Sequence, residues 1–236
     1  REILNSISDV TYLNYPAYDE VYEIIGKYDG IFPNAKMPID KKLLQKAKRL
    51  KVIAMPAMGI DHIDSDFCKN NNIQLFSLSD SREFMSGIPS TAEYTIGLIL
   101  TLLKKYRSSM NSVIHNNEWN TSKFRGFNLM DKKVGVVGYG TVGKRVAKLA
   151  KSFGSDVFFY DLFEQRSDET AKYVSFETIL SSMDIITVHV PLSEKTKKMF
   201  SKKEFSKMKN TYFVNASRGG VIDENDLVWG LKNKKI

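Results

Sequence analysis

The sequence contains a single cysteine, Cys68, among its 236 residues, so an internal disulfide is impossible. This excludes a disulfide-stapled scaffold, and with no signal-peptide pattern at the start we expect a buried, inert thiol in a cytoplasmic protein. No apolar run approaches the roughly 18–20 residues that a membrane-spanning helix needs, and the richest one, residues 94–103, is too short. The three histidines include no pair with metal-ligand spacing. We therefore expect neither a membrane partner nor a metal site.

The charge balance is basic but diffuse. Thirty-five Lys and Arg residues against 27 Asp and Glu residues give a net charge of +8. The excess is mainly lysine scattered over predicted helix faces, which favours solubility and a mild preference for anionic ligands. No basic stripe of the kind that nucleic-acid-binding proteins carry is evident, so we expect no nucleic-acid partner.

The most informative stretch is residues 132–161. An apolar run at 134–137 ends in the glycine turn Gly138-Tyr139-Gly140-Thr141-Val142-Gly143, and helical spacing of apolar residues follows. A second apolar run, residues 157–160, ends at Asp161. This order of strand, glycine turn, helix, strand and acid is typical of a βαβ unit that binds a dinucleotide.

Each feature of this unit has a physical reason. Gly138 permits a tight turn, Gly140 lets the backbone approach a pyrophosphate, and Gly143 lets the helix pack close to the strand. The helix N-terminus offers amides and its positive dipole end to a phosphate. Asp161 lies 18 residues after Gly143, close to the usual position of the acid that binds the adenosine ribose. A carboxylate there repels a 2′-phosphate, so NAD is favoured over NADP.

The flanking segments predict an α/β protein of two doubly wound domains. In residues 1–90 we predict helices at 3–7, 20–25, 39–47 and 65–70 and strands at 10–13, 28–32, 50–55 and 73–78, which indicates a parallel sheet. The polar segment 79–90, with Gly87 and Pro89, separates this domain from an apolar helix at 91–106. We expect that helix, within an interdomain segment 91–110, to pack across the boundary.

Residues 111–236 form the second predicted domain. After a loop at 115–127 and the βαβ unit, we expect helices at 175–181, 201–208 and 223–234 and strands at 185–190 and 212–216. A doubly wound sheet would continue into another strand, so we expect this domain to be incomplete at its C-terminus and the 236-residue chain by itself to be inactive.

Four landmarks together resemble the D-isomer-specific 2-hydroxyacid dehydrogenases, the family that includes D-3-phosphoglycerate dehydrogenase. They are the loop 57–64 (AMGIDHID), the glycine fingerprint, the segment 184–192 (DIITVHVPL) and residues 208–224, which include the run VNASRGGVIDE. The resemblance covers about residues 28–236. It implies a flavodoxin-like substrate domain followed by a Rossmann NAD-binding domain.

The resemblance also implies roles for individual residues. Met58 and Gly59 would hold the substrate carboxylate, with a simple glycine turn as the alternative. Arg218 would bind that carboxylate and polarise the 2-oxo group, where planar bidentate geometry matters; a surface salt bridge is its alternative. Asp61 is expected to cap a helix, and Asp223 with Glu224 to form the first turn of the last helix.

The expected cofactor contacts follow the fingerprint. His189 resembles the histidine of a segment that borders the cofactor, so we assign it cofactor contact and not proton transfer. The full predicted set comprises Gly138, Tyr139, Gly140, Thr141, Val142, Gly143, Asp161, His189, Val190, Pro191, Thr196, Ala216, Ser217 and Arg218.

Three departures limit the resemblance. The family's catalytic histidine and the glutamate that orients it fall after Ile236, so neither has a counterpart here. Asp131 replaces a common family glycine. Phe32 and Pro33 stand where phosphoglycerate dehydrogenases commonly carry Arg and Ser, which weakens a phosphoglycerate assignment.

The expected function is NAD-dependent interconversion of a D-2-hydroxyacid and a 2-oxoacid by hydride transfer. An NAD-sensing interaction module of the corepressor type is the alternative, since such proteins share this architecture. An adenosylhomocysteinase-like hydrolase is less consistent with the loop at Met58-Gly59. Family analogy further implies a homodimer joined through the nucleotide domain and the helix at 91–106.

Overall fold

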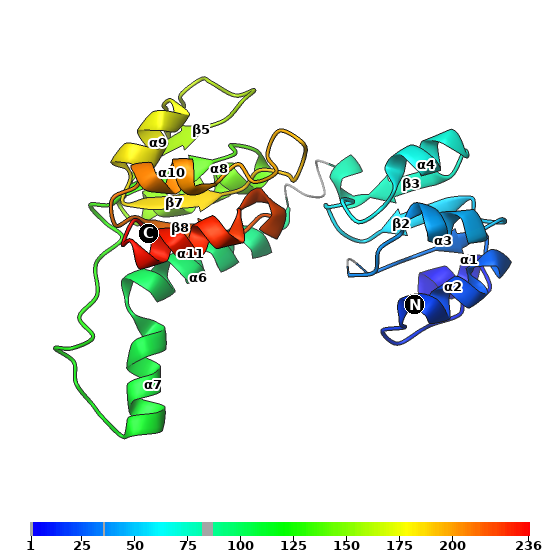
Figure 1. Cartoon of the computed structure of the whole chain (residues 1–236), viewed down its shortest axis with the longest axis horizontal. Coiled ribbons are helices and arrows are strands. Elements are labelled where there is room, and N and C mark those ends of the chain that lie inside the picture. Colours follow the sequence, from blue (N-terminus) through cyan, green and yellow to red (C-terminus); the bar gives the residue numbers. More distant parts are fainter. Residues whose placement is uncertain (1, 35, 82–86) are drawn as a thin grey trace. The chain divides into compact units, whose positions relative to one another are not determined.

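The computed structural model describes residues 2–34, 36–81 and 87–236. The chain forms two compact units, Arg1–Met85 and Ser86–Ile236, coloured from blue to cyan and from green to red in Figure 1. Residues 82–86, within the predicted polar break, lie outside the described residues.

The first unit is built on a parallel sheet of order β1-β2-β3, in which Gly30 pairs with Val52 and Val52 with Gln74. Side chains from its helices and from β2 form one apolar core, which includes Leu43, Ile53 and the buried thiol of Cys68. The predicted burial of Cys68 is therefore confirmed. The elements are α1 (Glu2–Ile7), α2 (Tyr18–Ile24), η1 (Ile25–Lys27), β1 (Gly30–Ile31), α3 (Lys41–Lys46), β2 (Val52–Met55), α4 (Ser65–Asn70), β3 (Gln74–Ser77) and η2 (Leu78–Asp80).

Two local predictions in this unit are wrong. Residues 10–13 form no strand, and side-chain hydrogen bonds hold the segment: Tyr28 donates to the Thr11 hydroxyl over 2.9 Å. The cap of α4 is Asp64 and not Asp61, because the Asp64 carboxylate accepts from the Phe67 amide at 2.9 Å.

The second unit is built on a parallel sheet of order β6-β5-β4-β7-β8. Numbered within the unit this is 3-2-1-4-5, which matches the first five positions of the usual Rossmann order. The strands are β4 (Lys133–Val137), β5 (Asp156–Tyr160), β6 (Lys172–Tyr173), β7 (Ile185–Val188) and β8 (Tyr212–Asn215); the helices are α6 (Ser90–Leu103), α7 (Tyr106–Asn116), α8 (Thr141–Ser152), α9 (Phe176–Ser182), α10 (Lys202–Lys207), η3 (Gly219–Val221) and α11 (Glu224–Lys232).

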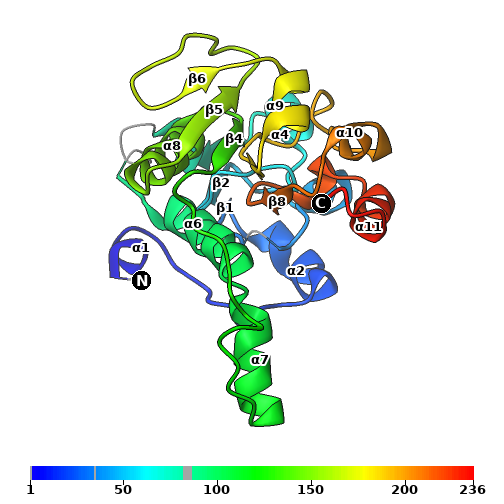
Figure 2. The ribbon, with the colours of Figure 1, turned by 90° about the vertical axis from the view of Figure 1, so that its left-hand side faces the viewer.

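Alternation along the strands explains why helices cover both faces of this sheet. Val136, Phe159 and Ile185 point into a core shared with α6 and α8, whereas Ile186 and Val188 point into a core shared with α9 and α10. Figure 2 shows α8 and α9 on either side of β4 and β5. The predicted doubly wound α/β architecture is confirmed for this unit.

The long apolar helix is shorter than predicted, and a second helix follows it. α6 ends at Leu103 and contacts α8 and β8, both in its own unit. After Lys105, which has a φ of 54°, the chain continues as α7, so the predicted loop 115–127 begins only beyond Asn116. Among the described helices, none combines the length and apolar character needed to cross a bilayer.

Asp131 is the residue that replaces a common glycine of the family that the sequence resembles. Its φ is +66°, in the left-handed region that glycine adopts freely. Aspartate is among the residues that tolerate this region best. Asp131 therefore adopts a backbone conformation that a glycine at this position would also accept.

Candidate functional site

The first and last glycines of the turn after β4 make contacts that leave no room for a side chain. Gly138 has a φ of +94°, and its amide donates to the Tyr160 carbonyl over 2.9 Å. A Cβ at Gly138 would lie 2.8 Å from both the carbonyl carbon and the oxygen of His189. A Cβ at Gly143 would lie 2.0 Å from the Gly138 carbonyl oxygen. Both glycines are therefore required by the packing of the protein against itself.

Gly140 differs from its two neighbours in the fingerprint. A Cβ there would meet no atom of the described residues within 4 Å, so the space beside this residue is open in the part of the chain that the structure describes. Gly140 is the N-cap of α8, and the first amides of a helix have no partner within the helix. An open backbone in front of a helix N-terminus can receive an anion such as a phosphate.

Asp161 directly follows β5 and faces the same turn. Its Oδ2 accepts from the Tyr139 amide at 2.7 Å, and its Oδ1 accepts from the amides of Phe163 at 2.8 Å and Glu164 at 3.1 Å. Burial acts to raise the pKa of Asp161, but these amide bonds outweigh it and hold that pKa below its ordinary value. The carboxylate is therefore ionised at neutral pH.

The segment after β7 lies against the glycine turn. The His189 amide donates to the Val137 carbonyl over 2.7 Å, and its Nε2 lies 2.9 Å from the Thr187 hydroxyl. His189 Nδ1 is buried and has no hydrogen-bond partner among the described residues. The Thr196 hydroxyl donates to the Pro191 carbonyl at 2.5 Å and accepts from the Ser193 amide at 2.8 Å, so it holds the 191–196 turn.

The segment after β8 is shaped by Asn215. Its Oδ1 accepts from the amide and hydroxyl of Ser217 at 3.0 and 2.7 Å, and its Nδ2 donates to the Arg218 carbonyl over 2.9 Å. The half-buried Arg218 side chain donates from Nη1 to the Ser217 carbonyl at 3.2 Å. Asp223 then caps α11 through the amides of Asn225 and Asp226, as predicted.

Parallel pairing brings most of the predicted residues to one edge of this sheet. β4, β5, β7 and β8 run in the same direction, so the glycine turn, Asp161, His189 and Arg218 all follow strand ends at the carboxyl edge. In Rossmann domains this edge is where nucleotides bind. Met58 and Gly59 belong to the first unit, where they follow β2; Met58 is exposed and Gly59 half-buried.

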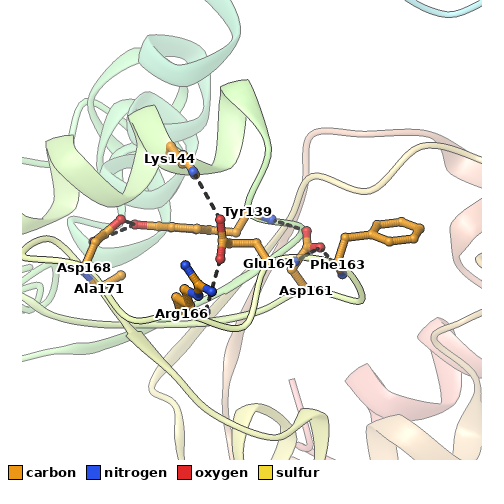
Figure 3. A network of polar contacts seen from close by, with 8 residues as sticks. All are labelled: Tyr139, Lys144, Asp161, Phe163, Glu164, Arg166, Asp168 and Ala171. Carbon is orange, nitrogen blue, oxygen red and sulfur yellow. Dashed lines mark hydrogen bonds and ion pairs between the residues drawn. The ribbon is translucent and has the colours of Figure 1, made fainter.

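Four polar residues around this turn were not recognised from the sequence as a group. The Tyr139 hydroxyl donates to Asp168, and Lys144 of α8 pairs with Glu164 at 3.8 Å (Figure 3). Asp168 accepts from the amides of Thr170 and Ala171, an Asx-type turn that an aspartate two residues before a threonine makes plausible from sequence. Its partner Tyr139 is too distant in sequence for any local pattern to reveal.

These features fit a dinucleotide. The open side of Gly140 at a helix N-terminus suits a pyrophosphate, and the ionised Asp161 can accept from a ribose hydroxyl. The buried His189 Nδ1 can hydrogen-bond to a bound group. The contacts with NAD that the sequence predicts stay predictions, and the local structure around these residues suits such a ligand.

Residues 96–236, more than half of the chain, match the family model described as "D-isomer specific 2-hydroxyacid dehydrogenase, NAD binding domain". The chain belongs to this family. D-3-phosphoglycerate dehydrogenase of Archaeoglobus fulgidus is 35% identical over 222 residues, which cover 92% of this chain and 41% of that protein. Hydroxypyruvate reductase of Thermotoga maritima is 30% identical, with coverage of 92% and 70%.

A solved structure of a family member agrees. D-lactate dehydrogenase from Aquifex aeolicus, crystallised with NAD and lactic acid, superimposes with a TM-score of 0.81 at 30% identity over 91% of this chain and 64% of that one. The chain spans less than half the length of the phosphoglycerate dehydrogenase that it matches. The family resemblance and the α/β fold predicted from the sequence are therefore confirmed, and NAD is the cofactor of the matched domain.

The buried imidazole of His189 makes the stability of the second unit depend on pH. Burial lowers the pKa of His189 to about 4, from 6.5. Between these values the unfolded chain binds a proton that the folded chain does not, so stability falls as the pH is lowered from 6.5 to 4, by at most about 3 kcal/mol. We expect urea midpoints to fall over this range, and His189→Asn to flatten the dependence.

His115→Asn, at an exposed position on α7, is the matched control for this prediction and should leave the pH dependence unchanged. An equal pH dependence in wild type and His189→Asn would contradict the assignment of the effect to His189.

Proposed function

We propose that this chain carries the NAD-binding machinery of an oxidoreductase that interconverts a D-2-hydroxyacid and a 2-oxoacid. The observation that carries the proposal is the open backbone at Gly140, set between the N-terminus of α8 and the ionised Asp161 in a domain of this family. When bound, NAD supplies or accepts the hydride, which is chemistry that no side chain provides.

The protein's own residues would bind and orient the reactants. Arg218, a permanent cation at the carboxyl edge, would hold the substrate carboxylate and polarise the 2-oxo group. Met58 and Gly59, after β2 of the first unit, would offer backbone amides to the substrate carboxylate. Ala216 and Ser217 would border the nicotinamide, and His189, Val190, Pro191 and Thr196 would border the cofactor on the β7 side.

The substrate we propose is a small, unphosphorylated 2-oxoacid. Phe32, which follows β1, is 59% exposed and apolar. An apolar side chain there offers no charge to a phosphate, whereas the arginine common at this position in phosphoglycerate dehydrogenases would. Hydroxypyruvate reductase among the relatives shows that the family includes enzymes named for unphosphorylated substrates. The relatives above are all named as enzymes, which gives the interaction-module alternative no support.

Calorimetry and a rate assay test the proposal. The chain should bind NADH, with NADPH at least about tenfold weaker because of the carboxylate at Asp161. The full-length product of the gene should oxidise NADH with glyoxylate or hydroxypyruvate faster than with phosphohydroxypyruvate. Arg218→Lys should lower kcat/KM with the oxoacid by a larger factor than it weakens NADH binding, because the guanidinium is assigned to both ligands and only the substrate needs its bidentate geometry. Absence of NADH binding by the chain would refute the proposal.

We also propose that the protein is a cytoplasmic homodimer that uses α7. This helix projects from the second unit (Figures 1 and 2), and it exposes Met110, Val113 and Ile114 at 58%, 43% and 62%. Exposed apolar side chains gathered on one helix are typical of an interface.

Replacing Ile114 with glutamate should convert a dimer to a monomer, because a charge would be buried in the interface. Light scattering after size-exclusion chromatography measures the mass. Asn111→Glu, an exposed polar position on the same helix, is the control and should remain dimeric if the apolar side chains form the contact. A monomeric wild type, or an Ile114→Glu variant that stays dimeric, would rule out this interface.

A further inference from the structure

The loop formed by residues 161–171 is attached to Tyr139 at two points (Figure 3). At its start, Asp161 Oδ2 accepts from the Tyr139 backbone amide at 2.7 Å. Near its end, the Tyr139 hydroxyl donates to the Asp168 carboxylate, 2.9 Å from Oδ2 and 3.1 Å from Oδ1. One residue of the glycine turn therefore holds both ends of the loop.

The Tyr139 ring has little freedom to move. It is 2% exposed and stacks on Phe159 with ring centroids 3.8 Å apart and planes at 14°. The ammonium of Lys144, a residue of α8, lies 5.4 Å from the centroid of the Tyr139 ring. Burial, together with the hydrogen bond to Asp168, raises the pKa of Tyr139, so its hydroxyl keeps its proton and remains a donor.

The carboxylates of Asp161 and Asp168, which Tyr139 holds in place, also accept hydrogen bonds from backbone amides of the loop. Asp168 Oδ1 accepts from the amides of Thr170 at 2.8 Å and Ala171 at 2.9 Å. At the other end, Asp161 Oδ1 accepts from two amides of the loop. Between the two ends, Glu164 accepts from the Arg166 amide at 3.1 Å and pairs with Lys144.

The three amides leave Asp161 little spare capacity. A carboxylate offers about four lone-pair sites, and three of those on Asp161 accept backbone amides. The remaining lone-pair site points in one direction. A small rotation of the Asp161 carboxylate would therefore break a hydrogen bond to a ribose hydroxyl, whereas an aspartate with fewer fixed partners could reorient and keep that bond.

We propose that Tyr139 is a positioning residue for the adenosine half of NAD: its amide and its hydroxyl together orient the Asp161 carboxylate by holding the 161–171 loop against the glycine turn. This inference rests on the proposed function, because it concerns the same bound dinucleotide. It adds a role for Tyr139 and Asp168 that neither the fingerprint nor the family match assigns.

Tyr139→Phe tests the inference, because it keeps the ring stack and removes only the hydroxyl. We expect NADH and ADP-ribose, which share the adenosine half, to bind about tenfold more weakly by calorimetry, by a similar factor for both. Hydrogen exchange at the amides of Thr170 and Ala171 should accelerate without ligand. Tyr173→Phe is the matched control, since Tyr173 packs edge-on against the same Phe159 at 5.6 Å; it should leave both affinities unchanged.

Asp168→Ala supplies a second route to the same contact, because it removes both oxygens that accept from the Tyr139 hydroxyl and leaves the aromatic stack in place. If Tyr139 acts through Asp168, the double variant should bind no more weakly than either single variant. Should Tyr139→Phe fail to fold, weaker binding by Asp168→Ala still supports the inference, and unchanged binding overturns it. Strictly additive losses in the double variant would also overturn it.

The outcomes separate this inference from the proposed function. A wild-type chain that binds neither NADH nor ADP-ribose would overturn both. A wild type that binds both ligands, with a Tyr139→Phe variant that binds them equally well, would overturn the positioning role alone.

Discussion

Gly143→Ala is expected to destabilise the second unit by about 3 kcal/mol and to lower NADH affinity by at least about 100-fold. The new Cβ would lie 2.0 Å from the Gly138 carbonyl oxygen and 3.2 Å from Val136 Cγ1. Because the nearest atom is backbone, no rotamer change relieves the clash, and α8 must move away from β4. The helix N-terminus that would receive the pyrophosphate moves with it. Urea unfolding and calorimetry measure the two effects.

Gly140→Ala is the matched control for this prediction. A methyl group there meets no atom of the described residues within 4 Å, and the φ of −82° suits alanine. The unfolding midpoint should therefore stay close to that of wild type. NADH binding should weaken, because the methyl occupies the open space that we assign to the pyrophosphate. Wild-type stability of Gly143→Ala would contradict the close helix–strand approach, and wild-type NADH affinity of Gly140→Ala would contradict the assigned position of the ligand.

Asp161→Ala should lower NADH affinity by about 100-fold without creating affinity for NADPH. Removing the carboxylate deletes the proposed ribose acceptor and leaves the amides of Tyr139, Phe163 and Glu164 without their shared partner. The loop start then loses its attachment, so neither cofactor finds an ordered site.

Calorimetry with NADH and NADPH checks this prediction, and Asp156→Ala is its control. Asp156 is an exposed carboxylate at the opposite end of β5, so its removal should leave both affinities unchanged. A gain of NADPH binding by Asp161→Ala would show that the carboxylate acts only as a specificity filter and not as the anchor of the loop.

The sequence was most informative where several local signals coincided. The turn at Gly138 to Gly143 is bounded by an apolar strand and an amphipathic helix, and the structure has β4, α8 and β5 at these positions. The start of α11 was predictable for a similar reason, since Asp223 provides a cap. β7 begins at Ile185 as predicted but ends at Val188, short of the predicted end at residue 190, because Pro191 limits how far a strand can run without marking where it stops.

Elsewhere the deciding interaction was not local. Residues 10–13 alternate like a strand but pair with none among the described residues. α7 was missed although Tyr106, Met110, Val113 and Ile114 recur at helical spacing, a signal that the sequence did carry. Asp61 and Asp64 are both plausible caps in sequence. Only the structure shows that α4 begins at Ser65, which makes Asp64 the residue whose carboxylate accepts from the Phe67 amide. The bond from Tyr139 to Asp168 spans 29 residues, beyond the reach of any periodicity.

The unequal surroundings of the three fingerprint glycines have an evolutionary consequence. Gly138 and Gly143 are required by the protein's own backbone, at the His189 carbonyl and at the turn itself. At Gly140, by contrast, none of the described residues lies close enough to exclude a side chain. A descendant that had abandoned its nucleotide would still retain the outer pair in order to fold. Only the middle glycine would be free to drift, so in distant homologues its loss is the informative signal of a domain that has become an empty scaffold.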